Sequence, residues 1–77
     1  MKEEVCRSAD GSVTRYSLAY IDPGIFPGDN GRVLGYDNAH GRHHRHFRGE
    51  QTEFVFRGFD RLVRHFELEV RELRRAK

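Results

Sequence analysis

Large apolar side chains stand at every second position along the first half of the chain. Within Ser12–Ile21 they are Tyr16, Leu18 and Tyr20. A period of two predicts a strand with one buried face. Arg32–Asp37 repeats this pattern with Leu34 and Tyr36 on one side, and it therefore predicts another strand.

Turn-forming residues separate these segments and predict two further strands. Asp10-Gly11 divides Glu3–Ser8 from the strand at Ser12, and His40-Gly41-Arg42 precedes a strand over His43–Arg48. In that last strand the period of two places alternate side chains on opposite faces. One face is expected to carry His44, His46 and Arg48, and the other His43, Arg45 and Phe47. Glu53–Phe56 fits either a short strand or a lead-in to a helix.

The apolar spacing changes to that of a helix in the last part of the chain. One stripe at this spacing consists of Phe59, Leu62, Val63, Phe66, Val70 and Leu73. The stripe predicts an amphipathic helix that begins after Gly58. Asp60 near its start, and Arg74 and Arg75 near its end, have the charges that the helix dipole favours.

These elements predict one small α+β domain over residues 1–77. We expect an antiparallel meander of about four strands with one C-terminal amphipathic helix packed on one face. The helix should cover the face that carries Tyr16, Leu18, Leu34 and Tyr36. If Phe47 points toward the helix, His44, His46 and Arg48 turn outward, and the open face is cationic.

Positive charge is concentrated in the middle of the chain, although the formal net charge is only +2. Gly31–Arg48 contains four arginines and four histidines against the single acid Asp37. Such a stretch attracts anions, and the phosphates of RNA or DNA are the commonest partners of this kind.

Cysteine usage and hydropathy restrict the class of protein. Cys6 is the only cysteine, which excludes a disulfide framework and a cysteine-based zinc site and fits a reducing compartment. No segment resembles a signal peptide or a membrane span, so we expect a soluble, cytoplasmic protein with no membrane partner. Because so small a domain buries only about two-thirds of its unfolded surface, a homodimer or a tight partner would stabilise it.

Four histidines within seven residues are the strongest candidates for chemistry: His40, His43, His44 and His46. Two histidines with differently tuned pKa values can act as base and acid in RNA cleavage, without a metal or other cofactor. We predict His44 and His46 as this pair, with His40 as the alternative partner. Asp37 would orient one of the imidazoles, as the third member of a catalytic triad does.

RNA cleavage also needs a cation for the charge that develops on phosphorus, and arginine supplies it through its bidentate fork. Arg45 and Arg48 are the first candidates and Arg42 is a further one. Tyr36 would stack on a base or donate a hydrogen bond at the edge of the site.

Other interpretations fit the same residues. The segment can be a non-catalytic module that binds nucleic acid or a partner protein, or a solvated surface with no role. It can also be a zinc, nickel or copper site built from His44, His46, His40 and Asp37. The metal site matches no named zinc spacing, and His43 cannot join it because adjacent strand residues point in opposite directions.

The string from Val33 to Gly41, followed by His43-His44-Arg45-His46, resembles the small toxin family TumE. TumE is the toxin half of a TumE–TumA toxin–antitoxin pair. In this family a Tyr-Asp-Asn-x-His motif ends a strand and a His-x-His strand follows. Phe59–Phe66 is similar to the amphipathic helix that comes next. The resemblance extends from about Tyr16 to Leu73.

The resemblance implies a bacterial or archaeal toxin with a cognate antitoxin. We expect this antitoxin to be acidic where it meets the cationic face, or to lay a helix or strand beside it. RNA cleavage is common among small basic toxins, and this analogy agrees with the His/Arg cluster. Gly35 departs from the family pattern, because an arginine often precedes the tyrosine. Arg42, Arg45 or Arg48 would then make the phosphate contact.

Overall fold

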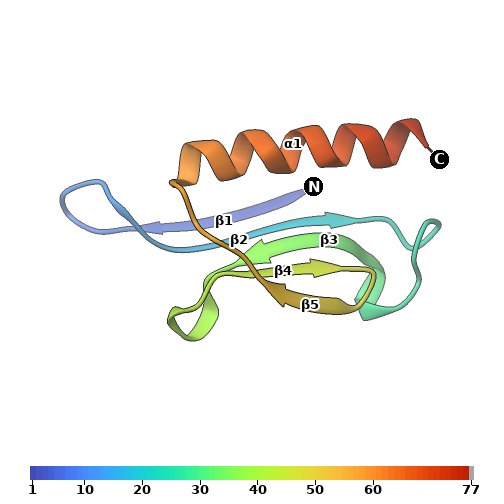
Figure 1. Cartoon of the computed structure of the whole chain (residues 1–77), viewed down its shortest axis with the longest axis horizontal. Coiled ribbons are helices and arrows are strands. Elements are labelled where there is room, and N and C mark those ends of the chain that lie inside the picture. The colour runs from blue at the N-terminus through green and yellow to red at the C-terminus, as the bar shows by residue number, and fades with distance from the viewer. Residues whose placement is uncertain (77) are drawn as a thin grey trace.

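The computed structural model describes residues 1–76, apart from the side chain of His40. Figure 1 shows the helix lying along the sheet. The elements are β1 (Lys2–Arg7), β2 (Val13–Ile21), β3 (Arg32–Asp37), β4 (His44–Phe47), β5 (Glu50–Glu53) and α1 (Phe59–Arg75), with 3₁₀ turns at Asp29–Gly31 and Ala39–Gly41.

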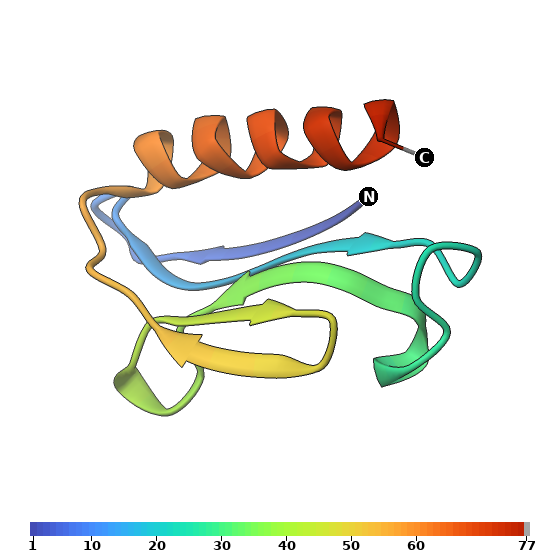
Figure 2. The same cartoon turned by 45° about the vertical axis from the view of Figure 1, so that its right-hand side comes forward.

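The sheet is an antiparallel meander in the order β1-β2-β3-β4-β5, and α1 packs on one face of it. Both views show α1 running along the same face from its start to its end (Figures 1 and 2). The predicted α+β class is therefore confirmed, with five strands in place of about four.

The additional strand is β5, which pairs with β4 through a tight hairpin. Arg48 and Gly49 form the turn with φ values of 47° and 86°. Two consecutive positive φ values match the right-handed twist of a hairpin. β5 begins before the predicted Glu53–Phe56 segment, and all four of its residues are polar and exposed. β5 therefore has no alternation of apolar and polar residues from which the sequence could predict a strand.

The β3–β4 register determines which side chains share a face. Asp37 lies opposite His44, and Gly35 lies opposite His46. Tyr36 lies opposite Arg45 on the other face. Paired residues project to the same side of a sheet. The face away from α1 therefore carries the polar side chains of Asp37, His44 and His46.

The core lies between the sheet and α1. Its buried residues are Tyr16, Leu18, Tyr20, Val33, Leu34, Tyr36, Leu62, Phe66 and Val70. The ring of Phe66 meets the ring of Tyr36 edge to face, at a centroid distance of 6.1 Å. The predicted burial of the strand face under the helix is confirmed.

Candidate active site

Asp37, His44 and His46 form one polar cluster on the open face of the sheet. Nε2 of His46 lies 2.9 Å from Oδ2 of Asp37, and Nδ1 of His44 lies 3.7 Å from Oδ1. The two imidazole centroids are 6.4 Å apart. The predicted common face of His44 and His46 is confirmed, and Asp37 reaches both.

The cluster is partly shielded and still open to solvent. The side chains of His44 and His46 are each 14% exposed, and that of Asp37 is 18% exposed. The backbone N–H of Ala39 donates to Oδ1 of Asp37 at 3.2 Å, which fixes the carboxylate. Nε2 of His44 and Nδ1 of His46 have no hydrogen-bond partner among the described residues. These two nitrogens are therefore available to exchange protons with a bound molecule.

Arg32 lies on the same face, beside His46. A Cβ on Gly35 would come within 2.9 Å of Cδ of Arg32, so the arginine stem crosses the space that the missing side chain leaves. Nε of Arg32 donates to Asp29 at 2.9 Å. Gly35 is also the residue that pairs with His46, which brings this guanidinium group to the site. Sequence reasoning missed Arg32, although a glycine inside a strand signals a close approach.

Arg15 provides a second cation that the sequence analysis missed. A cavity of about 460 Å³ borders Asp37 and is also lined by Arg15, Ser17, Glu4 and Cys6. Arg15 stands two residues before Ser17, which pairs with Asp37, so both arginine and carboxylate project to the open face.

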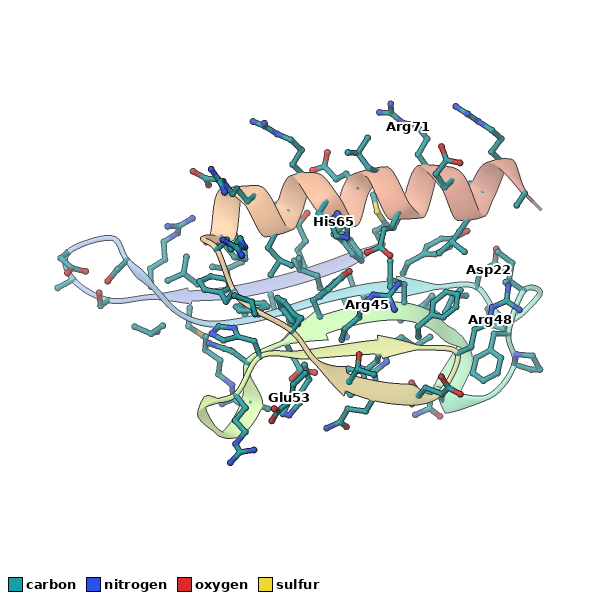
Figure 3. All side chains as sticks on the ribbon, viewed as in Figure 1. Asp22, Arg45, Arg48, Glu53, His65 and Arg71 are labelled. Atoms are coloured by element: carbon teal, nitrogen blue, oxygen red, sulfur yellow. The ribbon has the colours of Figure 1, made fainter. Side chains whose placement is uncertain are left out.

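The prediction that Arg48 continues the His44–His46 face is wrong. β4 ends at Phe47, and Arg48 takes a left-handed conformation in the hairpin turn. The guanidinium carbon of Arg48 lies 5.5 Å from the centroid of the Phe47 ring. Phe47 in turn packs against the core. Figure 3 shows Arg48 at the end of the sheet.

Arg42 lies at the rim of the open face, where its Nη1 donates to Glu53 at 2.9 Å. Glu53 pairs with His44 in the sheet, so the carboxylate belongs to this face as well. With Glu4 and Asp37 also present, the open face carries both signs of charge and is not cationic as predicted.

The expectation that Tyr36 borders the histidine pair is also wrong, because strand alternation sends it under α1. Its hydroxyl donates to Glu69. Arg45 lies on the same face as Tyr36. Its Nε donates to the Tyr36 hydroxyl at 3.0 Å, and its Nη2 donates to Glu69 at 2.6 Å. Figure 3 shows Arg45 rising from β4 toward the helix. Burial, and then the hydrogen bond to Glu69, raise the pKa of Tyr36 to about 12.

His43 has a structural role on the helix side. Its Nδ1 lies 2.8 Å from the hydroxyl of Tyr16. The imidazole stacks on Phe56 at a centroid distance of 4.2 Å and an interplanar angle of 4°. Asn38 joins the end of β3 to β2: its side chain accepts the Tyr16 N–H at 2.9 Å and donates to the Thr14 carbonyl at 3.0 Å. The predicted site residue His40 has its side chain outside the described part of the structure.

No group of three or more His, Cys, Asp or Glu side chains within the described residues is arranged to hold a metal ion. In the same part of the chain, α1 is too short and too polar to cross a membrane.

The model of the family described as Toxin TumE matches residues 2–74, which is nearly the whole chain. The curated proteins and the solved structures include no significant match.

Proposed function

The chain belongs to the TumE toxin family, and we propose that it exerts its toxicity as a metal-independent endoribonuclease in the cytoplasm. The observation that carries this proposal is the Asp37 carboxylate between His44 and His46, with contacts of 2.9 and 3.7 Å. A carboxylate that orients an imidazole, and a second imidazole nearby, are the groups that phosphodiester cleavage by general acid–base catalysis requires.

His46 is the proposed general base. Asp37 holds its Nε2–H, which fixes the tautomer with a basic Nδ1 and stabilises the imidazolium that forms. Nδ1 takes the proton of an RNA 2′-hydroxyl, and the 2′-oxygen attacks the adjacent phosphorus. The bond from phosphorus to the 5′-oxygen then breaks.

His44 is the proposed general acid. In its protonated form it donates the Nε2 proton to the leaving 5′-oxygen. The products are a 2′,3′-cyclic phosphate on one fragment and a 5′-hydroxyl on the other. His40, whose side chain is not described, is the alternative acid, because its turn precedes the β4 strand.

Arg32 is the proposed phosphate ligand, with Arg15 and Arg42 further out on the same side. The side chain of Arg32 is only partly exposed, and its Nε is held by the ion pair with Asp29 at 2.9 Å, so a phosphate would meet the outer nitrogens of the guanidinium. A bidentate contact to the non-bridging oxygens would stabilise the charge that grows in the transition state. Arg45, Arg48 and Tyr36 are off this face and are not assigned to that contact.

Growth and cleavage assays together test the proposal. Induction of the wild-type chain should arrest growth, and the purified protein should cleave RNA in the presence of EDTA. His44→Ala/His46→Ala should lose both effects. His65→Ala is the matched control, because His65 is an exposed histidine on the helix. Growth arrest by the double variant at equal protein level would leave a non-catalytic binding toxin as the explanation.

A further inference from the structure

A groove runs between α1 and the strand side of the molecule, on the face opposite the histidine pair. It consists of two cavities of about 300 and 370 Å³, which share the lining residues Arg45 and His65. We call it the α1 groove. Figure 3 shows Arg45 and His65 facing each other across it, one from β4 and one from α1.

The lining of the α1 groove is mainly apolar. Phe54, Val55 and Leu62 line the first cavity, and Phe47, Leu68 and Leu73 line the second. Val55 is 75% exposed and Leu68 is 51% exposed. Exposed aliphatic side chains along one groove favour a partner that brings apolar side chains of its own.

Charge distinguishes the two ends of the groove. Arg57 and Arg61 line the first cavity, and neither has an ion-pair partner among the described residues. Glu69, which lines the second cavity, is already matched by Arg45 at 2.6 Å and His65 at 3.2 Å. The end near Arg57 is therefore cationic and unmatched, and it is complementary to acidic side chains.

We propose that the α1 groove binds a segment of the cognate antitoxin in which acidic residues accompany apolar ones. The acidic residues would meet Arg57 and Arg61, and the apolar residues would cover Val55 and Leu68. This inference rests on membership of the toxin family and not on RNA cleavage. From Arg61 to Leu73 the groove follows α1 for about 18 Å, which suits roughly three turns of helix or about five residues of extended chain.

The position of the groove separates the proposed antitoxin contact from the histidine pair. The groove lies on the α1 side of the sheet, whereas His44 and His46 project from the other side. Affinity for the antitoxin segment is therefore separable from the catalytic pair. A protein partner is favoured over RNA here because Val55 and Leu68, the exposed hydrophobic side chains of the lining, are aliphatic and offer no stacking surface for bases.

Binding measurements with the purified antitoxin test this assignment. The probe is the protein encoded by the adjacent gene, defined by its ability to restore growth on co-expression. Arg57→Glu/Arg61→Glu should weaken its binding by about tenfold or more, because like charges then meet. Val55→Asp should weaken it comparably. His44→Ala/His46→Ala should bind as the wild type does, whether or not the toxin cleaves RNA.

Arg64→Glu/Arg71→Glu is the control, with the same charge change on the same helix. Neither arginine lines the groove, and Figure 3 shows Arg71 pointing away from the sheet. The affinity of this control variant for the antitoxin should stay within about twofold of the wild-type value, because charges outside the groove contribute little. Unchanged affinity in both groove variants would overturn the proposal. The proposal would also be overturned if the groove variants lost binding to a single-stranded oligoribonucleotide but kept binding to the antitoxin. That result would assign the groove to RNA.

Discussion

Asp37 and His46 face each other across the β3–β4 pair, with Oδ2 of the carboxylate 2.9 Å from Nε2 of the imidazole. They are not directly opposed, because Asp37 pairs with His44 and His46 pairs with Gly35. The contact is a diagonal one, between residues two positions apart in the register of the two strands. Asp37 can therefore reach both histidines.

Asp37→Asn should reduce RNA cleavage with little effect on stability. The amide can keep a hydrogen bond to His46, but it lacks the charge that stabilises the imidazolium and it can favour the wrong tautomer. A loss of about 10²- to 10⁴-fold in kcat is expected by analogy with other carboxylate–histidine pairs. Single-turnover cleavage of a labelled RNA measures it, and a variant with wild-type kcat would remove Asp37 from the mechanism.

Arg32→Gln should weaken cleavage more than Arg48→Gln does. Arg32 crosses the open face beside His46, whereas Arg48 lies over the ring of Phe47 in the hairpin turn. Loss of one charge-assisted contact to the transition state corresponds to roughly 1.5–3 kcal/mol, or about 10- to 10²-fold in kcat/KM. Equal losses in the two variants would contradict the assignment of the phosphate contact to Arg32.

Stability should fall in strongly alkaline solution because of Tyr36. Its pKa is raised from 10.0 to about 12 by burial and by the hydrogen bond to Glu69. Between these two values the unfolded chain has lost the phenolic proton and the folded chain keeps it. The stabilising contribution is thus complete below pH 10 and is lost as the pH rises toward 12.

Urea denaturation at a series of pH values measures this effect. Tyr36→Phe should show a smaller decline in the free energy of unfolding above pH 10 than the wild type does. Part of the decline should remain, because burial also raises the pKa of Tyr16. An identical decline in the wild type and in Tyr36→Phe would contradict the stated cause.

Phe66→Ala should destabilise the domain by about 3–5 kcal/mol, the usual cost of removing a buried aromatic ring. Phe66 is fully buried between α1 and the sheet, where it contacts Tyr36. Leu68→Ala is the comparison, because Leu68 is half exposed on the same helix and should cost much less. Chemical denaturation of the two variants gives both values.

The period of two was sufficient to predict the main geometry of the site from sequence. It separated His44 and His46 from His43, and it placed the helix over Leu18 and Leu34. These features follow from strand geometry alone, because successive side chains project to opposite faces. The catalytic roles of these residues remain predictions.

The errors arose where a strand ended or where sequence neighbours were taken as spatial neighbours. Arg48 left the face because a left-handed turn begins there, and a non-glycine residue seldom adopts that conformation. Tyr36 was grouped with Asp37 although adjacent strand residues point apart. Arg32 went unnoticed because its side chain runs along the strand to Gly35, a direction that periodicity does not give.

The central claim, cleavage by His46 and His44 through the 2′-hydroxyl, is tested most directly by the chemistry of the RNA ends. Wild-type protein in EDTA should yield a 2′,3′-cyclic phosphate and a 5′-hydroxyl, and a single 2′-deoxy substitution at the cleaved position should abolish the cut. His44→Ala/His46→Ala should leave the RNA intact. Cleavage of the 2′-deoxy substrate, or equal cleavage by the double variant, would contradict the account.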